Sequence, residues 1–246
     1  ILTGTTEQRI TEKIVRDFLS RRSQPNPTAS KQSVVHGIER VLILGGGNVA
    51  TLVIDILNRI PQQSPIGILD DDPQLQGRSV LGVPVLGTFE AIDALHQQNA
   101  FDAAALAVGI LPARKELFEQ LTQRGIPFTN IIDPTAVIGI NASMGTGNMI
   151  MAFCRLGPES TIGDNNFLSA YVNIEHHNQL GSHCTFGPSV YMSGGVHIGN
   201  AVRFGTGISI EPRLTIGERA IIASGVTITT NVPPDTVVKA KTNFTF

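Results

Sequence analysis

The chain has 246 residues, of which 41% are hydrophobic and 15% charged, with a formal net charge of −2 at pH 7. This length suffices for one large or two modest domains, and the near-neutral charge gives no electrostatic reason to expect nucleic acid or an anionic membrane as a partner. No apolar run reaches the roughly 18 residues of a membrane span, no signal peptide is predicted, and two cysteines, Cys154 and Cys184, are too few for a disulfide framework or a cysteine-based zinc site, so we expect a protein of the reducing cytoplasm.

Residues 1–39 are predicted to form a leader helix and a linker. Ile10, Ile14, Val15 and Phe18 recur at the spacing of one helical face, with charged residues between them. The stretch "SQPNPTASKQ" has the composition of a flexible linker. A packing helix and a partner-binding arm both remain open.

From Arg40 the pattern changes to strands that alternate with helices. The run "RVLILGGGNVATLVIDILNRI" predicts a strand, a glycine turn and a helix, and "PIGILDDDP" predicts a second strand. The remaining elements are a helix, a buried strand, a helix and a strand, in "FEAIDALHQQ", "FDAAALAVG", "ARKELFEQLTQRG" and "IPFTNIID". This alternation predicts a small Rossmann-like α/β domain with a parallel sheet over residues 40–133.

From Ile138 to Ile228 the chain repeats every six residues. All sixteen residues at this spacing are large and apolar, and glycine follows nine of them. A strict hexapeptide period predicts a parallel β-helix, here over residues 134–246, in which the apolar residue points inward and the small residue lets the chain turn. Three hexads per coil give roughly five coils, each of which buries its neighbour. The predicted fold class is therefore mixed, an α/β domain followed by a β-helix.

The hexads, together with the preceding "LILGGGNVA" and "ILDDDP", resemble the left-handed β-helix acyltransferases. The combination is similar to the bacterial sugar acyltransferases that include nucleotide-amino-sugar N-acetyltransferases and the sialic acid O-acetyltransferase group. The resemblance covers about residues 40–238. It implies a homotrimer with acetyl-CoA between adjacent β-helices, the nucleotide of the acceptor on the N-terminal domain, and no metal. We therefore expect an acetyl-CoA-dependent sugar N-acetyltransferase of glycan biosynthesis, with O-acetylation of a free sugar acid as an alternative.

Two adjacent histidines stand in "NIEHHNQLG". The family motif resembles H-[DEN]-[CN]-x-[IL]-G, and this register, with His176 five residues before Gly181, implies that His176 is the catalytic base. An imidazole can take a proton from an attacking amine near neutral pH. His177 is the second catalytic candidate. It stands where relatives often carry a carboxylate that supports the base, and Glu175 is a candidate to supply that carboxylate here. Because neighbours on a strand point to opposite sides, we expect only one of the two histidines to face the groove unless a turn intervenes. The alternative to a catalytic role is that both histidines are surface residues of a turn.

The resemblance also implies a site for the sugar nucleotide. Backbone N–H groups of a glycine loop at a helix N-terminus attract phosphate, and a pair of carboxylates suits ribose hydroxyls or a uracil edge. The matching residues are Gly45, Gly46, Gly47, Asn48, Val49, Asp70, Asp71 and Gly109. Relatives often have histidine at the position of Val49 and polar residues after Gly109, where this chain has "ILPARK". A solvated turn is the alternative for the carboxylates.

For acetyl-CoA the matching positions are Thr185, Thr206 and Ser224. Thr206 and Ser224 lie eighteen residues apart, one full coil, so they are predicted to stack along one edge, where a row of backbone groups suits a pantetheine arm. Thr185 stands where relatives often have histidine, and the tail lacks the "G-x-P-A" segment that often follows.

Three other functions share features with this sequence. Zinc carbonic anhydrases use the same β-helix with three histidine ligands, but His176, His183 and His197 do not have the required spacing. A dinucleotide-dependent oxidoreductase needs a complete glycine fingerprint and a longer N-terminal domain. The departures from the family pattern leave open a trimeric scaffold or binding module that has lost catalysis.

Overall fold

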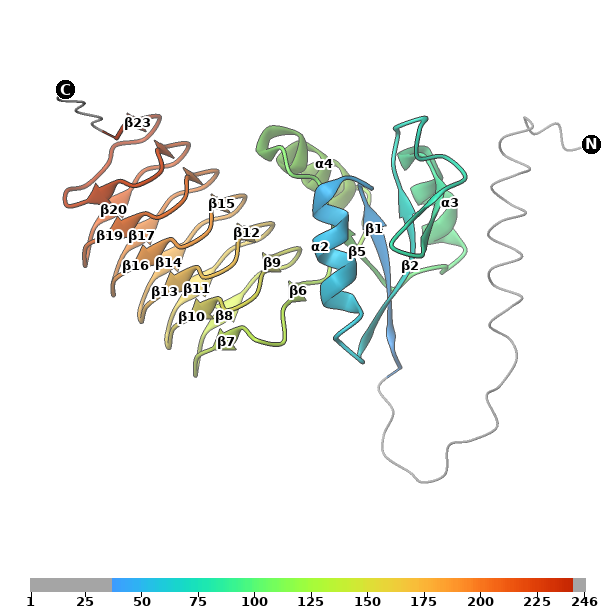
Figure 1. Cartoon of the computed structure of the whole chain (residues 1–246), viewed down its shortest axis with the longest axis horizontal. Coiled ribbons are helices and arrows are strands. Elements are labelled where there is room, and N and C mark those ends of the chain that lie inside the picture. Colours follow the sequence, from blue (N-terminus) through green and yellow to red (C-terminus); the bar gives the residue numbers. More distant parts are fainter. Residues whose placement is uncertain (1–36, 241–246) are drawn as a thin grey trace, which may run out of the picture. The chain divides into compact units, whose positions relative to one another are not determined.

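The structure, a computed structural model, describes residues 37–240, which fall into two compact units divided between Val108 and Gly109 (Figure 1). The predicted leader helix lies outside the described residues. The domain limits inferred from the sequence, 1–39, 40–133 and 134–246, remain predictions. The helix of residues 111–123, which we assigned to the first domain, belongs to the second unit.

The first unit is a five-stranded sheet in the order β3-β4-β2-β1-β5. Its strands are β1 (Glu39–Leu44), β2 (Gln63–Leu69), β3 (Ser79–Val80), β4 (Val83–Gly87) and β5 (Ala103–Leu106), and its helices are α2 (Asn48–Leu57), the 3-10 helix η1 (Phe89–Ala91) and α3 (Ile92–Gln97). All strand pairs are parallel except β3 with β4. Continuous apolar runs in β1 and β5 are buried, as expected for parallel strands. The predicted Rossmann-like alternation is confirmed, whereas the β3–β4 hairpin was missed.

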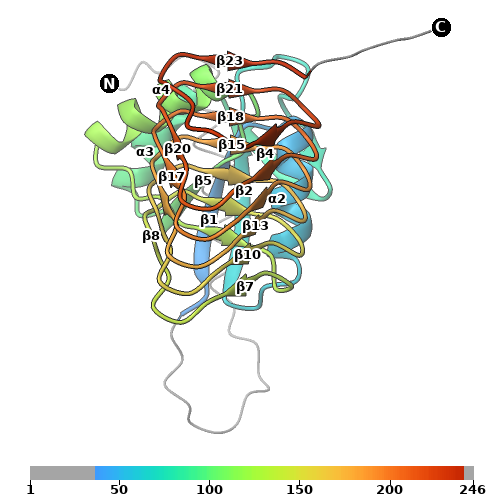
Figure 2. The same ribbon diagram turned by 90° about the vertical axis from the view of Figure 1, so that its left-hand side faces the viewer.

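The second unit is a left-handed β-helix with three parallel sheets, which we call faces. The first face contains β7 (Val137–Ile138), β10 (Arg155–Leu156), β13 (Asn173–Ile174), β16 (Tyr191–Met192), β19 (Ser209–Ile210) and β22 (Thr227–Ile228). The second contains β8 (Ser143–Met144), β11 (Thr161–Ile162), β14 (Gln179–Leu180), β17 (His197–Ile198) and β20 (Thr215–Ile216). The third contains β6 (Ile131–Ile132), β9 (Met149–Ile150), β12 (Phe167–Leu168), β15 (Thr185–Phe186), β18 (Arg203–Phe204), β21 (Ile221–Ile222) and β23 (Val237–Val238). Figure 2 shows the coils stacked from β7 to β23.

The hexapeptide period accounts for this stack. The second residue of every strand from β7 to β22 is one of the sixteen repeated apolar residues, and those from Ile138 to Ile210 each pair with the residue eighteen positions on, as Leu156 does with Ile174. All of them are buried except Ile138 and Met144 in the first coil. Phe186 and Phe204 stack inside the column with ring centroids 4.6 Å apart. The predicted β-helix is therefore confirmed.

The corners between faces have a fixed backbone conformation. Three positions after every repeated apolar residue except Ile228 the chain adopts positive φ, and most of these positions are not glycine. His177, for example, has φ 58°, and its N–H donates to the carbonyl of Pro158 one coil earlier, at 3.0 Å. The left-handed conformation costs L-residues energy, so the hydrogen bonds between coils help to hold these corners. We name the corners first (face one to two), second (two to three) and third (three to one).

Both ends of the β-helix depart from the sequence expectation. The strand in "IPFTNIID" was assigned to the α/β sheet, but β6 pairs with β9, and the Ile131 N–H donates to the carbonyl of Asn148 at 2.8 Å. This assignment was wrong, because the strand starts the stack of the third face. At the other end, Ile222 pairs with Val238, so the last coil is two residues short.

Candidate functional site

The two adjacent histidines meet at the first corner, between β13 and β14. Their Nδ1 atoms lie 2.9 Å apart, and their rings are nearly perpendicular with centroids at 5.1 Å. Both side chains are exposed. A turn does intervene here, the exception allowed for in the sequence expectation: His177 adopts φ 58° after the strand has ended, so strand alternation does not separate the two rings.

The surroundings of His176 orient its ring. A Cβ built on Gly194, in the next coil, would overlap the imidazole, so the ring lies directly over this glycine. The Glu175 carboxylate points elsewhere: it pairs with Arg155 Nη1 at 2.6 Å and accepts from Asn173 Nδ2 at 3.2 Å. The Arg155 guanidinium holds the pKa of Glu175 below its usual value. The hydrogen bonds of the Glu175 carboxylate therefore go to Arg155 and Asn173 and not to His176.

The residues expected to hold acetyl-CoA divide into two places. Thr206 and Ser224 stack at the third corner, both exposed, and the Ser224 hydroxyl accepts from the Thr206 N–H at 3.0 Å. This confirms the stacking expected from their spacing. Thr185 lies in β15 on the third face, where its hydroxyl accepts from Arg114 Nη2 at 2.9 Å. One chain therefore does not bring its own His176, at the first corner, together with Thr206 and Ser224.

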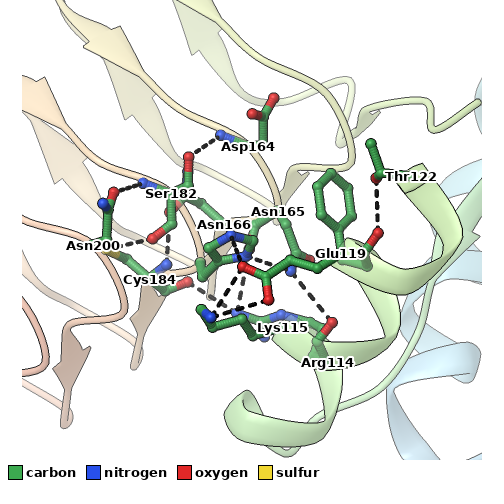
Figure 3. Close-up of polar contacts among 12 residues, drawn as sticks. Arg114, Lys115, Glu119, Thr122, Asp164, Asn165, Asn166, Ser182, Cys184 and Asn200 are labelled. Atoms are coloured by element: carbon green, nitrogen blue, oxygen red, sulfur yellow. Dashed lines mark hydrogen bonds and ion pairs between the residues drawn. The ribbon is translucent and has the colours of Figure 1, made fainter.

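A pocket of about 990 Å³ lies between the second corner and the start of α4 (Leu111–Gln123), within the second unit. Gly109 and Thr185, both singled out from the sequence, line it together with Lys115, Glu119 and His183. Lys115 Nζ and Glu119 Oε1 are 3.0 Å apart, and Figure 3 shows both side chains on α4 beside the coils. The pocket thus combines charges of both signs with apolar helix residues.

His183 is a pocket residue that sequence reasoning considered only as a failed zinc ligand. Its Nδ1 accepts from Asn165 Nδ2 at 2.9 Å, which leaves the proton of the neutral ring on Nε2, 3.7 Å from Glu119 Oε1. Burial lowers the pKa of His183. His197 lies in β17 and is exposed. Over residues 37–240, no three His, Cys, Asp or Glu side chains gather as a metal site.

Arg114 is a buried cation that sequence reasoning missed. Its side chain is 1% exposed, and Nη2 donates to the carbonyl of Cys184 at 3.1 Å as well as to Thr185. Nε and Nη1 are buried without a partner, and burial lowers the pKa of Arg114 to about 10. The sequence did contain a signal, because Arg114, Phe118 and Leu121 recur at helical spacing and form the buried side of α4.

The glycine loop of the first unit joins β1 to α2. Gly45 has φ 102°, and a Cβ there would collide with the carbonyl of Ala107. Gly46 donates its N–H to Asp70 Oδ2 at 2.5 Å, and the Asp72 N–H donates to Asp70 Oδ1 at 2.7 Å. Asp70 therefore holds the glycine loop through Oδ2 and its own turn after β2 through Oδ1.

The helix start beside this loop is open. Gly47 is the N-cap of α2, with no side-chain cap and nothing within 4 Å of an added Cβ, and Asn48 and Val49 are the first helical residues. Such a start suits an anion. Asp71 is exposed, with Oδ1 accepting from the Phe89 N–H at 2.9 Å. Of the two predicted carboxylates, Asp71 is the better placed to meet a ligand.

The chain is similar in sequence and structure to known acetyltransferases. Residues 40–121 match the PglD N-terminal domain family. A mutant perosamine N-acetyltransferase from Caulobacter crescentus, solved with CoA and GDP-perosamine, is 30% identical, with a TM-score of 0.75 over 83% of this chain and 93% of that one. The acetyltransferase domain of PglB from Neisseria gonorrhoeae, with acetyl coenzyme A, is 25% identical, with a TM-score of 0.76 over 82% and 96%. WeeI from Acinetobacter baumannii is 21% identical with a TM-score of 0.56 over 80% and 94%, which supports the fold alone.

No curated protein matches the chain by sequence. Among the helices of the described chain, none has the length and apolar character to cross a membrane.

Proposed function

Because this chain belongs to the left-handed β-helix, hexapeptide-repeat family of bacterial sugar acyltransferases, we propose that it transfers the acetyl group of acetyl-CoA to the amine of a nucleotide-linked amino sugar. The observation that carries the proposal is the identity of 30% over 93% of an N-acetyltransferase described with CoA and GDP-perosamine. The geometry of His176 supports it, since an exposed imidazole with a hydrogen-bonded Nδ1 can use Nε2 as a base.

In the proposed reaction, His176 first accepts and then donates one proton. The neutral amine attacks the thioester carbonyl, the C–N bond forms, and the C–S bond breaks. His176 Nε2 takes the proton released by nitrogen and returns it to the departing thiolate, so that N-acetyl sugar and CoA leave with the imidazole neutral again. His177 contacts His176 and not the reacting atoms.

We propose that the cosubstrates bind at the positions that the resemblance implies. Thr206 and Ser224 offer an exposed, stacked edge for the extended arm of acetyl-CoA, and Thr185 contributes from the third face. The nucleotide diphosphate of the acceptor fits the open start of α2 at Gly47, Asn48 and Val49. Gly45 and Gly46 shape that loop, Asp70 orders it, and Asp71 and Gly109 are offered to the rest of the nucleotide sugar.

We further propose a homotrimer in which the His176 corner of one subunit faces the cofactor edge of another. The separation of these residues on different corners of one chain supports this arrangement. A cytoplasmic location in bacterial glycan biosynthesis fits the two cysteines, Cys154 and Cys184, which are both free and buried.

The test is acetyl transfer measured by CoA release with a panel of UDP-, GDP- and dTDP-linked amino sugars. We expect one of these acceptors to be acetylated, and His176→Ala to lower kcat by about 10²- to 10⁴-fold, the usual contribution of a general base. His197→Ala, which removes an exposed histidine from β17, is the matched control and should keep wild-type kcat. A wild type that acetylates none of the acceptors, or a fully active His176→Ala variant, would favour the scaffold function instead.

A further inference from the structure

The contact between the two histidines carries information about where their protons are. Nδ1 of His176 and Nδ1 of His177 lie 2.9 Å apart, a hydrogen-bond distance. Such a contact requires one nitrogen to carry hydrogen and the other to present a lone pair. Two neutral rings can satisfy it in only two ways, according to which of them donates.

These two arrangements have opposite consequences at Nε2 of His176. If His177 donates, His176 carries its own hydrogen on Nε2 and has no lone pair there. If His176 donates from Nδ1, its Nε2 has the lone pair, and His177 carries its hydrogen on its own Nε2. Only the second arrangement makes His176 a base at the nitrogen that points away from its partner.

We infer that His177 is a positioning residue that holds His176 in the tautomer protonated at Nδ1 and accepts a charge-assisted hydrogen bond when His176 becomes an imidazolium. This inference rests on the proposed function and specifies how its base is prepared. An imidazolium N–H that donates to a neutral ring forms a stronger bond than a neutral pair does. A histidine thus supports the base in this chain.

The backbone holds both partners of the pair in place. The His177 N–H donates to the carbonyl of Pro158, and the carbonyl of His176 accepts from the Gly195 N–H, both at 3.0 Å. The pair is therefore tied to the coil before and the coil after. The ring of His176 lies over Gly194 of the next coil, whose lack of a side chain leaves room for it.

Within the described residues, no carboxylate is hydrogen-bonded to either ring. Glu175 is engaged by Arg155, and Glu159, at the same corner position as His177 one coil earlier, accepts from Asn141 Nδ2 at 2.6 Å. Arg213 occupies the same corner position two coils after His177. The support of the base in the described chain therefore comes from His177.

The test uses three substitutions that suit the left-handed corner, since glycine, asparagine and aspartate tolerate positive φ. His177→Gly removes the acceptor, and we expect kcat to fall about 10- to 100-fold, the usual loss when a group that orients a histidine is removed, with KM for acetyl-CoA unchanged. His177→Asn restores a neutral acceptor and should recover most of kcat. His177→Asp should recover kcat and move the acid limb of the pH profile of kcat to higher pH, because an anion favours the imidazolium form of His176. A His177→Gly variant with wild-type kcat and pH profile overturns the inference.

A spectroscopic readout separates this inference from the proposed function. In protein labelled with 15N-histidine, the His176 signals are assigned by their loss in His176→Ala. We expect the Nδ1–H tautomer in the wild type and a shift toward Nε2–H in His177→Gly. An Nε2–H tautomer in the wild type overturns the inference whether or not acetyl transfer is found. An Nδ1–H tautomer in a protein without acetyltransferase activity supports the pair and rejects the proposed function.

Discussion

Gly194 leaves the space that the His176 ring occupies. The two residues are one coil apart, and a methyl group on Gly194 would overlap the imidazole. Because the ring is exposed, it can swing aside at little cost in stability. A side chain at position 194 is therefore expected to disturb the orientation of the His176 ring more than the stability of the fold.

Gly194→Ala is expected to lower kcat by about 10²-fold, the scale of loss for a misplaced catalytic group, and to change the melting temperature little. Ser193→Ala, at the neighbouring position, adds no volume and serves as the control. The measurement is steady-state kinetics together with thermal unfolding of both variants. Unchanged kcat in Gly194→Ala would show that the ring position seen here is not the working one.

His183 makes stability depend on pH. Its pKa in the folded chain is lowered below the ordinary value of 6.5 mainly by burial, with Lys115 and Arg114 adding to the effect and Glu119 and Asp164 opposing it. As pH falls, the unfolded chain therefore takes up this proton first, and the folded state loses stability through the interval from about pH 6.5 down to the folded pKa.

The free energy of unfolding of His183→Asn should approach that of the wild type, or exceed it, as pH falls from about 8 to 5, because the variant lacks this proton uptake. Asparagine suits the φ of 64° at this corner. Urea unfolding at several pH values measures the difference in the free energy of unfolding between wild type and His183→Asn, and His197→Asn gives the reference for an exposed histidine. A difference that widens toward low pH would contradict a lowered pKa of His183 in the folded chain.

The sequence could identify single residues only where a motif fixed their register. His176 is a candidate base because of its spacing to Gly181, and this role stays a prediction, whereas the stacking of Thr206 on Ser224 followed from the length of a coil. The His176–His177 contact could not be predicted from strand alternation, because it depends on the left-handed φ of His177. The burial of Arg114 was missed because it depends on the coils that α4 covers.

At the scale of elements, α4 is attached to the coils by a buried cation and aromatic rings. Phe118 lies with its ring centroid 4.5 Å from Phe128 and 5.7 Å from His183. The Arg114 guanidinium is buried with two nitrogens unpartnered. Its acceptor at Cys184 also receives the Phe167 N–H at 2.9 Å, so this carbonyl keeps a partner without Arg114.

Arg114→Met, which keeps most of the volume and removes the charge, is expected to change the free energy of unfolding by no more than about 1 kcal/mol, since it relieves the desolvation of an unpaired ion. Arg114→Ala, which also opens a cavity, is expected to cost about 2–4 kcal/mol. Chemical denaturation of the two variants measures the difference. Equal losses in both would mean that the hydrogen bonds of the guanidinium outweigh its burial cost.

The elements themselves were predictable to different degrees. The hexad period defined every strand from β7 to β22, because the apolar residue recurs without interruption. The start of the third face at β6 was missed although Ile132 lies six residues before Ile138. The short last coil could not be predicted, because the period ends at Ile228. The β3–β4 hairpin was missed because its strands are short and lack alternation.

At the scale of the whole molecule, the positions of the site residues divide the proposed reaction between subunits. His176 lies at the first corner, whereas Thr206 and Ser224 lie at the third. Both sets of residues are candidates that the resemblance implies, and their placement on different corners depends on how many residues each face and corner takes. The central claim is that His176 of one copy works on acetyl-CoA held by another.

Mixed oligomers test this claim most directly. One variant, His176→Ala, lacks the base, and a second, Thr206→Arg with Ser224→Arg, blocks the exposed edge; each alone should be inactive. Co-expressed in equal amounts as trimers with head-to-tail interfaces, they should recover about a quarter of wild-type activity, because about one site in four then combines an intact base with an intact edge. An active edge variant, or mixed oligomers without recovered activity, would contradict a site shared between copies.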